Sequence, residues 1–222
     1  MVNAFFLPNS VLSLLGGLVA LTVSYYAHRY GRVAGSGFLQ MLSLGFMLLG
    51  IGLLAQASAF IFFALNAGKI SGRGTFVYGG TIIYLALQGV AYLLIAVSYA
   101  RRLQRGVVMT AVAAPIGLLQ LLPTSYPPLL FGTQVLEFGE LILAVLVGII
   151  VFQEFLVYED NRNRLSLTVL GAFSFILLAH MAKLSASLLS SGLLYLAGGL
   201  VQLAGFGLLL LFVLMSGPDG RA

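Results

Sequence analysis

The sequence predicts an all-α membrane protein, a single domain of seven transmembrane helices spanning residues 1–222. Hydrophobic residues make up 60% of the chain and charged residues only 8%, and the mean hydropathy is +1.08. A soluble domain carries about 25% charged residues. Apolar runs of about 20 residues, the length that crosses a bilayer, recur along the chain. We therefore expect a multi-pass protein of the cell membrane, surrounded by lipid and without a second, soluble domain.

Each apolar run is bounded by residues that begin or end helices. Asn9 and Ser10, after Pro8, are suited to cap the first helix. The glycine-rich stretch GRVAGSG separates the first two runs. The prolines of PTSYPP end the fourth, and Gly217–Pro218 ends the last. The predicted spans are 10–28, 38–65, 76–100, 107–122, 130–157, 165–190 and 193–216.

Basic residues in the short loops predict the orientation. Only Lys69 and Arg73 follow even-numbered spans, whereas eight arginines follow odd-numbered ones. Since basic short loops stay on the cytoplasmic side, the N-terminus is expected outside and the C-terminus inside. The net charge of +5 is thus a topology signal, and we expect no nucleic-acid partner. The N-terminus has no basic region before its apolar run, so no removable signal peptide is expected. The eight are Arg29, Arg32, Arg101, Arg102, Arg105, Arg162, Arg164 and Arg221.

A faint internal repeat favours a parallel three-plus-one-plus-three arrangement. LGFMLLGIGLLAQASAF in the second span resembles LGAFSFILLAHMAKLSA in the sixth, which aligns Gln56 with His180. QGVAYLLIAV in the third resembles QLAGFGLLLLFV in the seventh. Leucine-rich segments also match one another without common descent, so the repeat is a hypothesis. If it is real, a ligand is expected at the bundle centre, between the repeats.

Ionisable residues inside the apolar runs mark the candidate site. A charge at the bilayer centre costs about 2.5–3.5 kcal/mol on insertion scales, so such groups face the bundle interior. In the sixth span His180, Lys183, Ser187 and Ser190 are spaced by three, four and three residues, which places them on one helix face. The fifth span carries a similar stripe of Thr133, Glu137, Glu140, Ala144 and Gly148.

These groups are predicted to lie at one level in the outer half of the membrane. At a rise of 1.5 Å per residue, Glu137 and Lys183 lie about 10 Å below the outer edge, and Glu140 and His180 about 15 Å. Three glutamines on other helices lie about 13–15 Å below it. The predicted ligand or ion-pair cluster is Glu137, Glu140, His180, Lys183, Gln56, Gln88 and Gln202.

The cluster suggests specific pairs. We expect Lys183 to be held by Glu137 or Glu140, with His180 taking the other carboxylate or a glutamine. Two carboxylates three residues apart repel, so the one without the lysine is expected to be protonated or paired with a protonated histidine. Polar residues between membrane helices also serve purely as contacts between helices, and this structural alternative stays open.

Three further side chains are candidates for lining a pocket. Tyr84 and Tyr92 lie four residues either side of Gln88 and share its helix face, although packing is the alternative role. Ser187 is the third. Glu154, near the inner end of the fifth span, is expected at the membrane interface.

Several classes of site are disfavoured by the sequence. With no cysteine, the chain has neither disulfides nor thiolate sites. Haem within a bundle usually needs facing histidines, but His28 and His180 lie at different depths. A zinc hydrolase needs three ligands with one open position, and the sequence offers one buried histidine with two glutamates. We expect no metal and no cofactor.

The layout resembles two families of seven-helix proteins, the microbial opsins and the input modules of prokaryotic sensor proteins. LYLAGGLVQLAGFGLLLL (194–211) is similar to the closing helix of the sensor modules. Opsins attach retinal through a lysine in the seventh helix, whereas Lys183 is in the sixth, so retinal is not expected. Sensor modules usually feed a kinase or cyclase, and only six or so residues follow the last span here. The resemblance thus implies a separate signalling partner.

The sequence leads to a ranked set of functional hypotheses. The first is a non-enzymatic receptor-like or sensor-like module, or a membrane subunit of a larger complex, with a polar pocket open toward the outer face. Homo-oligomers fit the same hypothesis. The alternative is a small transporter that moves a solute or proton past Glu137, Glu140, His180 and Lys183. An intramembrane enzyme that uses the same carboxylates is the third. The sequence does not specify the ligand.

Overall fold

The computed structural model describes residues 3–65, 73–103 and 131–215, which form α-helices joined by turns where the chain is continuous. These residues contain six of the seven predicted spans. The fourth, 107–122, lies outside the described residues, as do PTSYPP and Gly217–Pro218. The helices are α1 (Asn3–Val33), α2 (Gly37–Leu65), α3 (Arg73–Leu103), α5 (Phe131–Asn161), α6 (Arg164–Leu188) and α7 (Gly192–Met215).

All six described helices are long and apolar enough to cross a membrane. The shortest, α7, has 24 residues, which corresponds to about 36 Å of helix, more than the roughly 30 Å of a bilayer's hydrocarbon core. A helix satisfies its own backbone hydrogen bonds, as a segment in lipid must. The chain is therefore an all-helical, multi-pass integral membrane protein.

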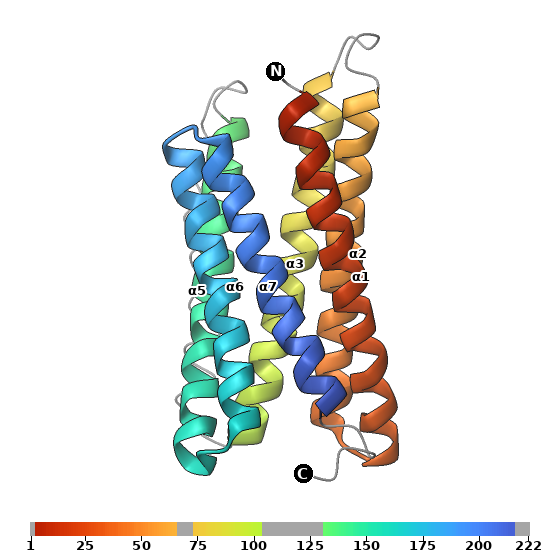
Figure 1. Ribbon diagram of the computed structural model, residues 1–222, viewed down its shortest axis with the longest axis vertical. Coiled ribbons are helices and arrows are strands. Elements are labelled where there is room, and N and C mark those ends of the chain that lie inside the picture. The colour runs from red at the N-terminus through yellow and green to blue at the C-terminus, as the bar shows by residue number, and fades with distance from the viewer. Residues whose placement is uncertain (1–2, 66–72, 104–130, 216–222) are drawn as a thin grey trace.

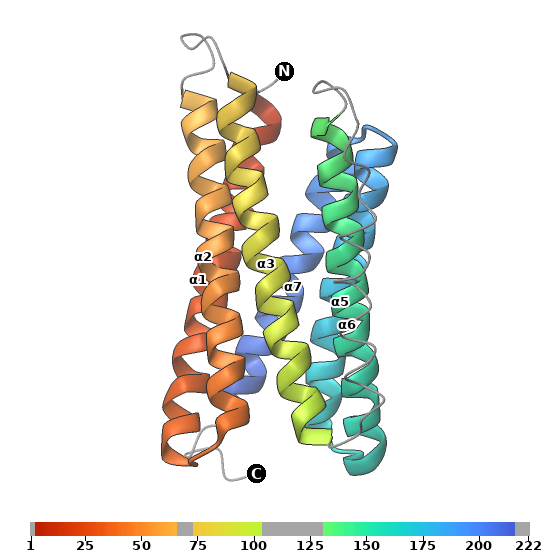
Figure 2. The same cartoon turned by 180° about the vertical axis from the view of Figure 1, so that it is seen from behind.

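The six helices form a closed ring. Each packs on two neighbours in the order α1, α2, α3, α5, α6, α7, and α7 returns to α1. Figures 1 and 2 show the ring from opposite sides as two groups, α1–α2–α3 and α5–α6–α7, referred to below as the first and second halves. In Figure 1, α7 crosses from α6 at the N-terminal end of the bundle toward α1 at the other end. In Figure 2, α3 crosses similarly from α2 toward α5.

The first helix begins earlier than the sequence predicted. It starts at Asn3 and includes Pro8, so the prediction that Asn9 and Ser10 cap it was wrong. Pro8 is the sixth residue of this helix and follows the first turn, so the helix runs through it with one backbone hydrogen bond missing. The Ser10 hydroxyl instead donates to the Phe6 carbonyl at 2.7 Å, a bond within the helix.

Each of the three tight turns between described helices contains a residue with positive φ: Gly35, Arg162 and Ser190. Gly35, at φ 62°, ends α1, and the Ser36 N–H donates to the Gly31 carbonyl at 2.9 Å. This is a Schellman ending, for which glycine is the usual residue. Ser190, at φ 51°, ends α6 with the equivalent bond from Ser191 to Ala186. Ser190 therefore lies beyond the helix, and the polar stripe predicted for the sixth span ends before it.

Glycines allow close packing within each half. A Cβ at Gly45 in α2 would lie 3.1 Å from the Ala91 carbonyl oxygen of α3. A Cβ at Gly205 in α7 would lie 2.8 Å from the Ala172 carbonyl oxygen of α6. Such small residues are common where membrane helices approach closely. Gly45 and Gly205 thus let the backbones of α2 and α3, and of α6 and α7, approach closely.

Replacing Gly205 by valine should separate α6 from α7. The added side chain would meet backbone, which cannot move aside, so we expect the variant to lose about 1–3 kcal/mol of unfolding free energy. Reversible unfolding in mixed micelles measures this. Gly207→Val is the matched control, because a Cβ at Gly207 meets no atom within 4 Å. Equal stability of the two variants would contradict the assigned packing.

Candidate functional site

Six of the seven residues predicted to form the polar cluster are buried in the ring interior. None of the six exposes more than 3% of its surface. Polar side chains in a membrane-spanning bundle have no water to bind, so their partners must come from other helices. These six are Gln56, Gln88, Glu140, His180, Lys183 and Gln202.

Lys183 is held by α3 and α7. Its Nζ donates to Oε1 of Gln202 at 2.5 Å and to the hydroxyl of Tyr84 at 3.0 Å. The same Nζ lies 5.5 Å from the Tyr84 ring centroid and 5.6 Å from that of Tyr195. Aromatic faces at this distance attract a cation. The ammonium is thus surrounded by two oxygen acceptors and two rings.

The predicted pairing of Lys183 with a glutamate was therefore wrong. Along a helix, residues three apart differ by about 60° around the axis and about 4.5 Å in height. His180 consequently faces α5, while Lys183 faces α3 and α7. The sequence argument compared depth but not direction around the helix.

A second chain of hydrogen bonds joins α5, α6 and α3. Nδ1 of His180 lies 2.7 Å from Oε2 of Glu140, and Nε2 lies 3.1 Å from the Tyr92 hydroxyl. A carboxylate only accepts, so the Nδ1 proton points to Glu140. With a neutral imidazole, the Tyr92 hydroxyl donates to Nε2. The Tyr92 and His180 rings also meet edge to face at 5.5 Å. The expectation that His180 takes a carboxylate agrees with this geometry.

The remaining helices join through Gln56. The Ser13 hydroxyl of α1 donates to Oε1 of Gln56 at 3.1 Å, and Nε2 of Gln56 donates to the Tyr195 hydroxyl of α7 at 3.5 Å. Sequence reasoning missed Ser13 and Tyr195. Tyr195 lies seven residues before Gln202, two turns along the same face, and this spacing could have indicated it. All six described helices thus contribute to one polar layer, called the central network below. Its members are Ser13, Gln56, Tyr84, Tyr92, Glu140, His180, Lys183, Tyr195 and Gln202.

Three predicted site residues lie outside the central network. Glu137 and Ser187 are half-buried, and neither side chain hydrogen-bonds to a network member within the described part of the chain. Gln88 is fully buried between Tyr84 and Tyr92 on α3, but its amide nitrogen and oxygen have no partner among the described residues. The two tyrosines do more than pack, since each hydroxyl binds an ionisable group of α6.

Polar residues are also buried in the other half of α5. Glu154 is 3% exposed and Gln153 is fully buried, whereas Glu154 was expected at the membrane interface. Glu140 and Gln153 are 13 residues apart, about 20 Å along the helix. Buried Leu143, Val147 and Ile150 occupy the interval. The polar groups at the two levels of α5 are therefore separated by an apolar layer.

A small cavity lies at the seam between α1 and α7, beside Lys183. Its volume is about 10 Å³, close to the space that one water molecule needs. Gly16 and Gly199 leave room in its wall, and Lys183 and Gln202 lie behind it. Nε2 of Gln202 is buried and has no hydrogen-bond partner among the residues that the structure describes. Polar donors and apolar side chains such as Leu53 and Phe206 thus line an opening between the two halves.

Neither metal chemistry nor a known relative assigns a role to this site. Within residues 3–65, 73–103 and 131–215, no three histidine or acidic side chains lie close enough together to hold a metal ion. Comparison with protein-family models, curated proteins and solved structures finds no match for the chain. The function must therefore be argued from the central network itself.

Removing the Tyr92 hydroxyl should destabilise the protein. In Tyr92→Phe, Nε2 of His180 would be buried without a donor, so we expect a loss of about 1 kcal/mol of unfolding free energy. Unfolding in mixed micelles measures the loss, with Tyr25→Phe as the control because Tyr25 is 62% exposed. If the two variants are equally stable, the Tyr92–His180 bond contributes nothing.

Proposed function

We propose that the protein is a non-enzymatic sensor-like module of the cell membrane, whose central network links the relative position of its two halves to protonation or ligand binding. One observation carries the proposal: hydrogen bonds from three network members cross between the halves. They join Lys183 to Tyr84, His180 to Tyr92, and Tyr195 to Gln56. The two basic groups of the central network, His180 and Lys183, are thus among the residues that join the halves.

The charge on His180 determines the direction of its hydrogen bond with the Tyr92 hydroxyl, which crosses between the halves. A neutral Nε2 accepts a hydrogen bond from the Tyr92 hydroxyl, whereas a protonated Nε2 can only donate one. Protonation therefore requires the Tyr92 hydroxyl to turn its own proton toward another acceptor. Since α3 and α6 are not neighbours in the ring, this bond spans the interior. A switch of this kind is a local electrostatic change acting on a two-state packing.

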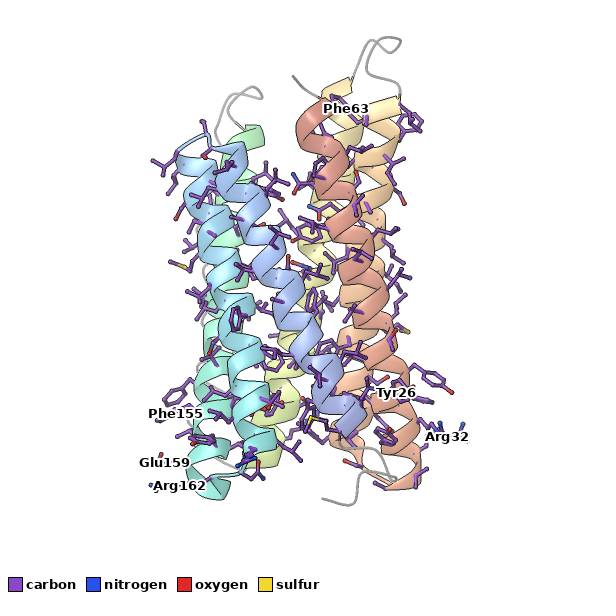
Figure 3. All side chains as sticks on the ribbon, in the orientation of Figure 1. Tyr26, Arg32, Phe63, Phe155, Glu159 and Arg162 are labelled. Carbon is purple, nitrogen blue, oxygen red and sulfur yellow. The ribbon has the colours of Figure 1, made fainter. Side chains whose placement is uncertain are left out.

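The orientation and the seventh span are part of the proposal. Arg32 and Arg162 lie at the same end of the bundle, opposite Phe63, as Figure 3 shows. Basic residues favour the cytoplasmic side, so this arrangement supports the proposal that the N-terminus lies outside. Helices α3 and α5 run in the same direction, so α3 ends and α5 begins at opposite ends (Figures 1 and 2). This polarity supports a further span between them, at 107–122.

The three-plus-one-plus-three repeat also fits the ring. Exchanging α1–α2–α3 with α5–α6–α7 reproduces the order of neighbours, including the two contacts that close the ring, α3 with α5 and α7 with α1. The exchange matches Gln56 with His180 and Gln88 with Gln202, all of them buried. Two related halves that share a polar centre are a natural arrangement for motion about that centre.

A signal from such a module would pass to another protein. We propose a separate partner subunit or a second copy of this chain, in contact with the helix faces that the ring directs to lipid. Large apolar side chains such as Leu200, Leu178 and Phe152 are exposed on these faces.

A small transporter is the second candidate, favoured by the burial of Gln153 and Glu154 in the other half of α5. Polar groups at two levels are what a pathway needs. The apolar layer of about 20 Å between Glu140 and Gln153 counts against it. Proton or solute uptake into liposomes, abolished by Glu140→Gln, would put the transporter first.

The sensor proposal predicts a pH-dependent distance between the halves. Because the chain has no cysteine, spin labels can be placed on cysteines at Ala34 and Arg164, which are exposed at the same end of the bundle, one in each half. On acidification from pH 8 through the titration of His180, we expect the electron–electron distance in nanodiscs to change by about 2 Å or more. Tyr92→Phe should abolish the change.

The control pair is Ala34 with Arg101, both exposed in the first half. Its distance should stay constant across the same pH range. An unchanged distance between the halves, or an equal change in both pairs, would contradict the proposal.

A further inference from the structure

We propose that the cavity between α1 and α7 is a binding site for one small anion, such as a halide, taken up beside Lys183. The cavity is bounded by Ser13 and Gly16 of α1, Gln56 of α2, Lys183 of α6, and Gly199 and Gln202 of α7. Of its polar lining residues, Asn9, Gln56, Lys183 and Gln202 are buried, whereas Ser13 and Tyr195 are half-buried. The site is thus assembled from four helices of both halves.

Two side chains that line the cavity, Gln202 and Lys183, have N–H donors beyond those used in their hydrogen bonds. Gln202 gives its oxygen to Lys183 at 2.5 Å, which fixes the orientation of the amide, since the reverse would place its NH₂ against an ammonium. Nε2 of Gln202 therefore carries two N–H donors, and this buried atom has no partner among the described residues. Lys183 has three N–H donors, and its recorded hydrogen bonds use two. A ligand that only accepts hydrogen bonds would satisfy these donors.

Charge favours an anion over a neutral acceptor. Lys183 makes no ion pair with a carboxylate in the described part of the chain, because Glu140 is bound to His180. A buried cation whose contacts are neutral oxygens and rings attracts a negative ion strongly in a low dielectric. A cavity of about 10 Å³, the size of one water, is too small for a carboxylate or phosphate group, and a halide, which is somewhat larger than water, enters only if the side chains at the seam move apart slightly.

The charge balance of the central network links binding of the anion to protonation of His180. With a neutral imidazole, Lys183 and Glu140 cancel, and a proton on His180 adds one positive charge. The groups that face His180 are Glu140 from α5, Tyr92 from α3 and, one turn along α6, Lys183. Tyr84 and Tyr195 face Lys183. An anion beside Lys183 restores neutrality, so anion binding should strengthen as the pH falls.

This inference deepens the proposed function by naming a ligand class for the same network. It rests on that proposal only for the consequence of binding, not for binding itself. If an anion binds but the distance between the halves does not change, the sensor function is wrong and the anion site stands. A pH-dependent distance without anion binding would do the reverse.

The test is thermal unfolding of the full chain in detergent, with chloride compared with gluconate at equal ionic strength. Gluconate is too large for the cavity. At pH 5.5 we expect chloride to raise Tm by about 3 °C or more, and by less at pH 8. If the cavity holds only a water molecule, Tm should be the same in chloride and in gluconate.

Two variants localise the effect. Lys183→Met removes the charge, and Gly16→Ala narrows the cavity with a methyl group that would lie 3.4 Å from Phe206 and 3.5 Å from Leu53, ordinary contacts that should not impair folding. Both should lose the chloride-specific rise in Tm. Gly171→Ala is the matched control, since a Cβ there meets no atom within 4 Å, and it should keep the rise.

Crystals grown in bromide provide a direct readout. We expect an anomalous peak within hydrogen-bond distance of Lys183 Nζ and Gln202 Nε2. Equal Tm in chloride and gluconate at both pH values would overturn the proposal. So would a chloride effect that persists in Gly16→Ala, because the ion would then bind elsewhere.

Discussion

An ammonium group in an apolar bundle must find all its partners inside the protein, and this constraint shapes the structure around Lys183. The side chain is 3% exposed and is held by Gln202, Tyr84 and two aromatic rings. A buried ammonium without hydrogen-bond partners would cost several kcal/mol, so the helices that supply these contacts are held in register. Because the contacts come from α3 and α7, the lysine of α6 connects the two halves of the ring. The cavity lies beside the same side chain.

The helices were largely predictable, because apolar runs and their glycine or proline boundaries depend on local chemistry alone. The ends were less so. Pro8 was expected to lie just before the first helix, but the helix starts at Asn3 and continues through Pro8 with one backbone hydrogen bond missing. Ser190 fits the helical spacing of α6, yet the turn forces it to φ 51°. Serine rarely adopts a positive φ, so a serine in the sequence does not indicate such a turn, whereas a glycine would.

The polar layer was predictable in height but not in direction. Counting residues places His180 and Glu140 at a common level, and the two are in contact. The same counting placed Lys183 beside a glutamate, whereas a rotation of about 60° directs it to Gln202. Direction depends on which helices are neighbours, and a ring order cannot be derived from one sequence. The tyrosine hydroxyls were underestimated for the same reason, since packing and hydrogen bonding look alike in an apolar run.

The most direct test uses the fact that the chain has only two lysines, Lys69 and Lys183. In Lys69→Arg protein with ¹⁵N-labelled lysine, a single ammonium signal remains. If Lys183 is enclosed as described, its protons should exchange slowly with water, and Tyr84→Phe should shift the signal. If the ammonium protons exchange fast with water and the signal does not shift in Tyr84→Phe, the lysine does not join the halves. The account of the central network would then be wrong.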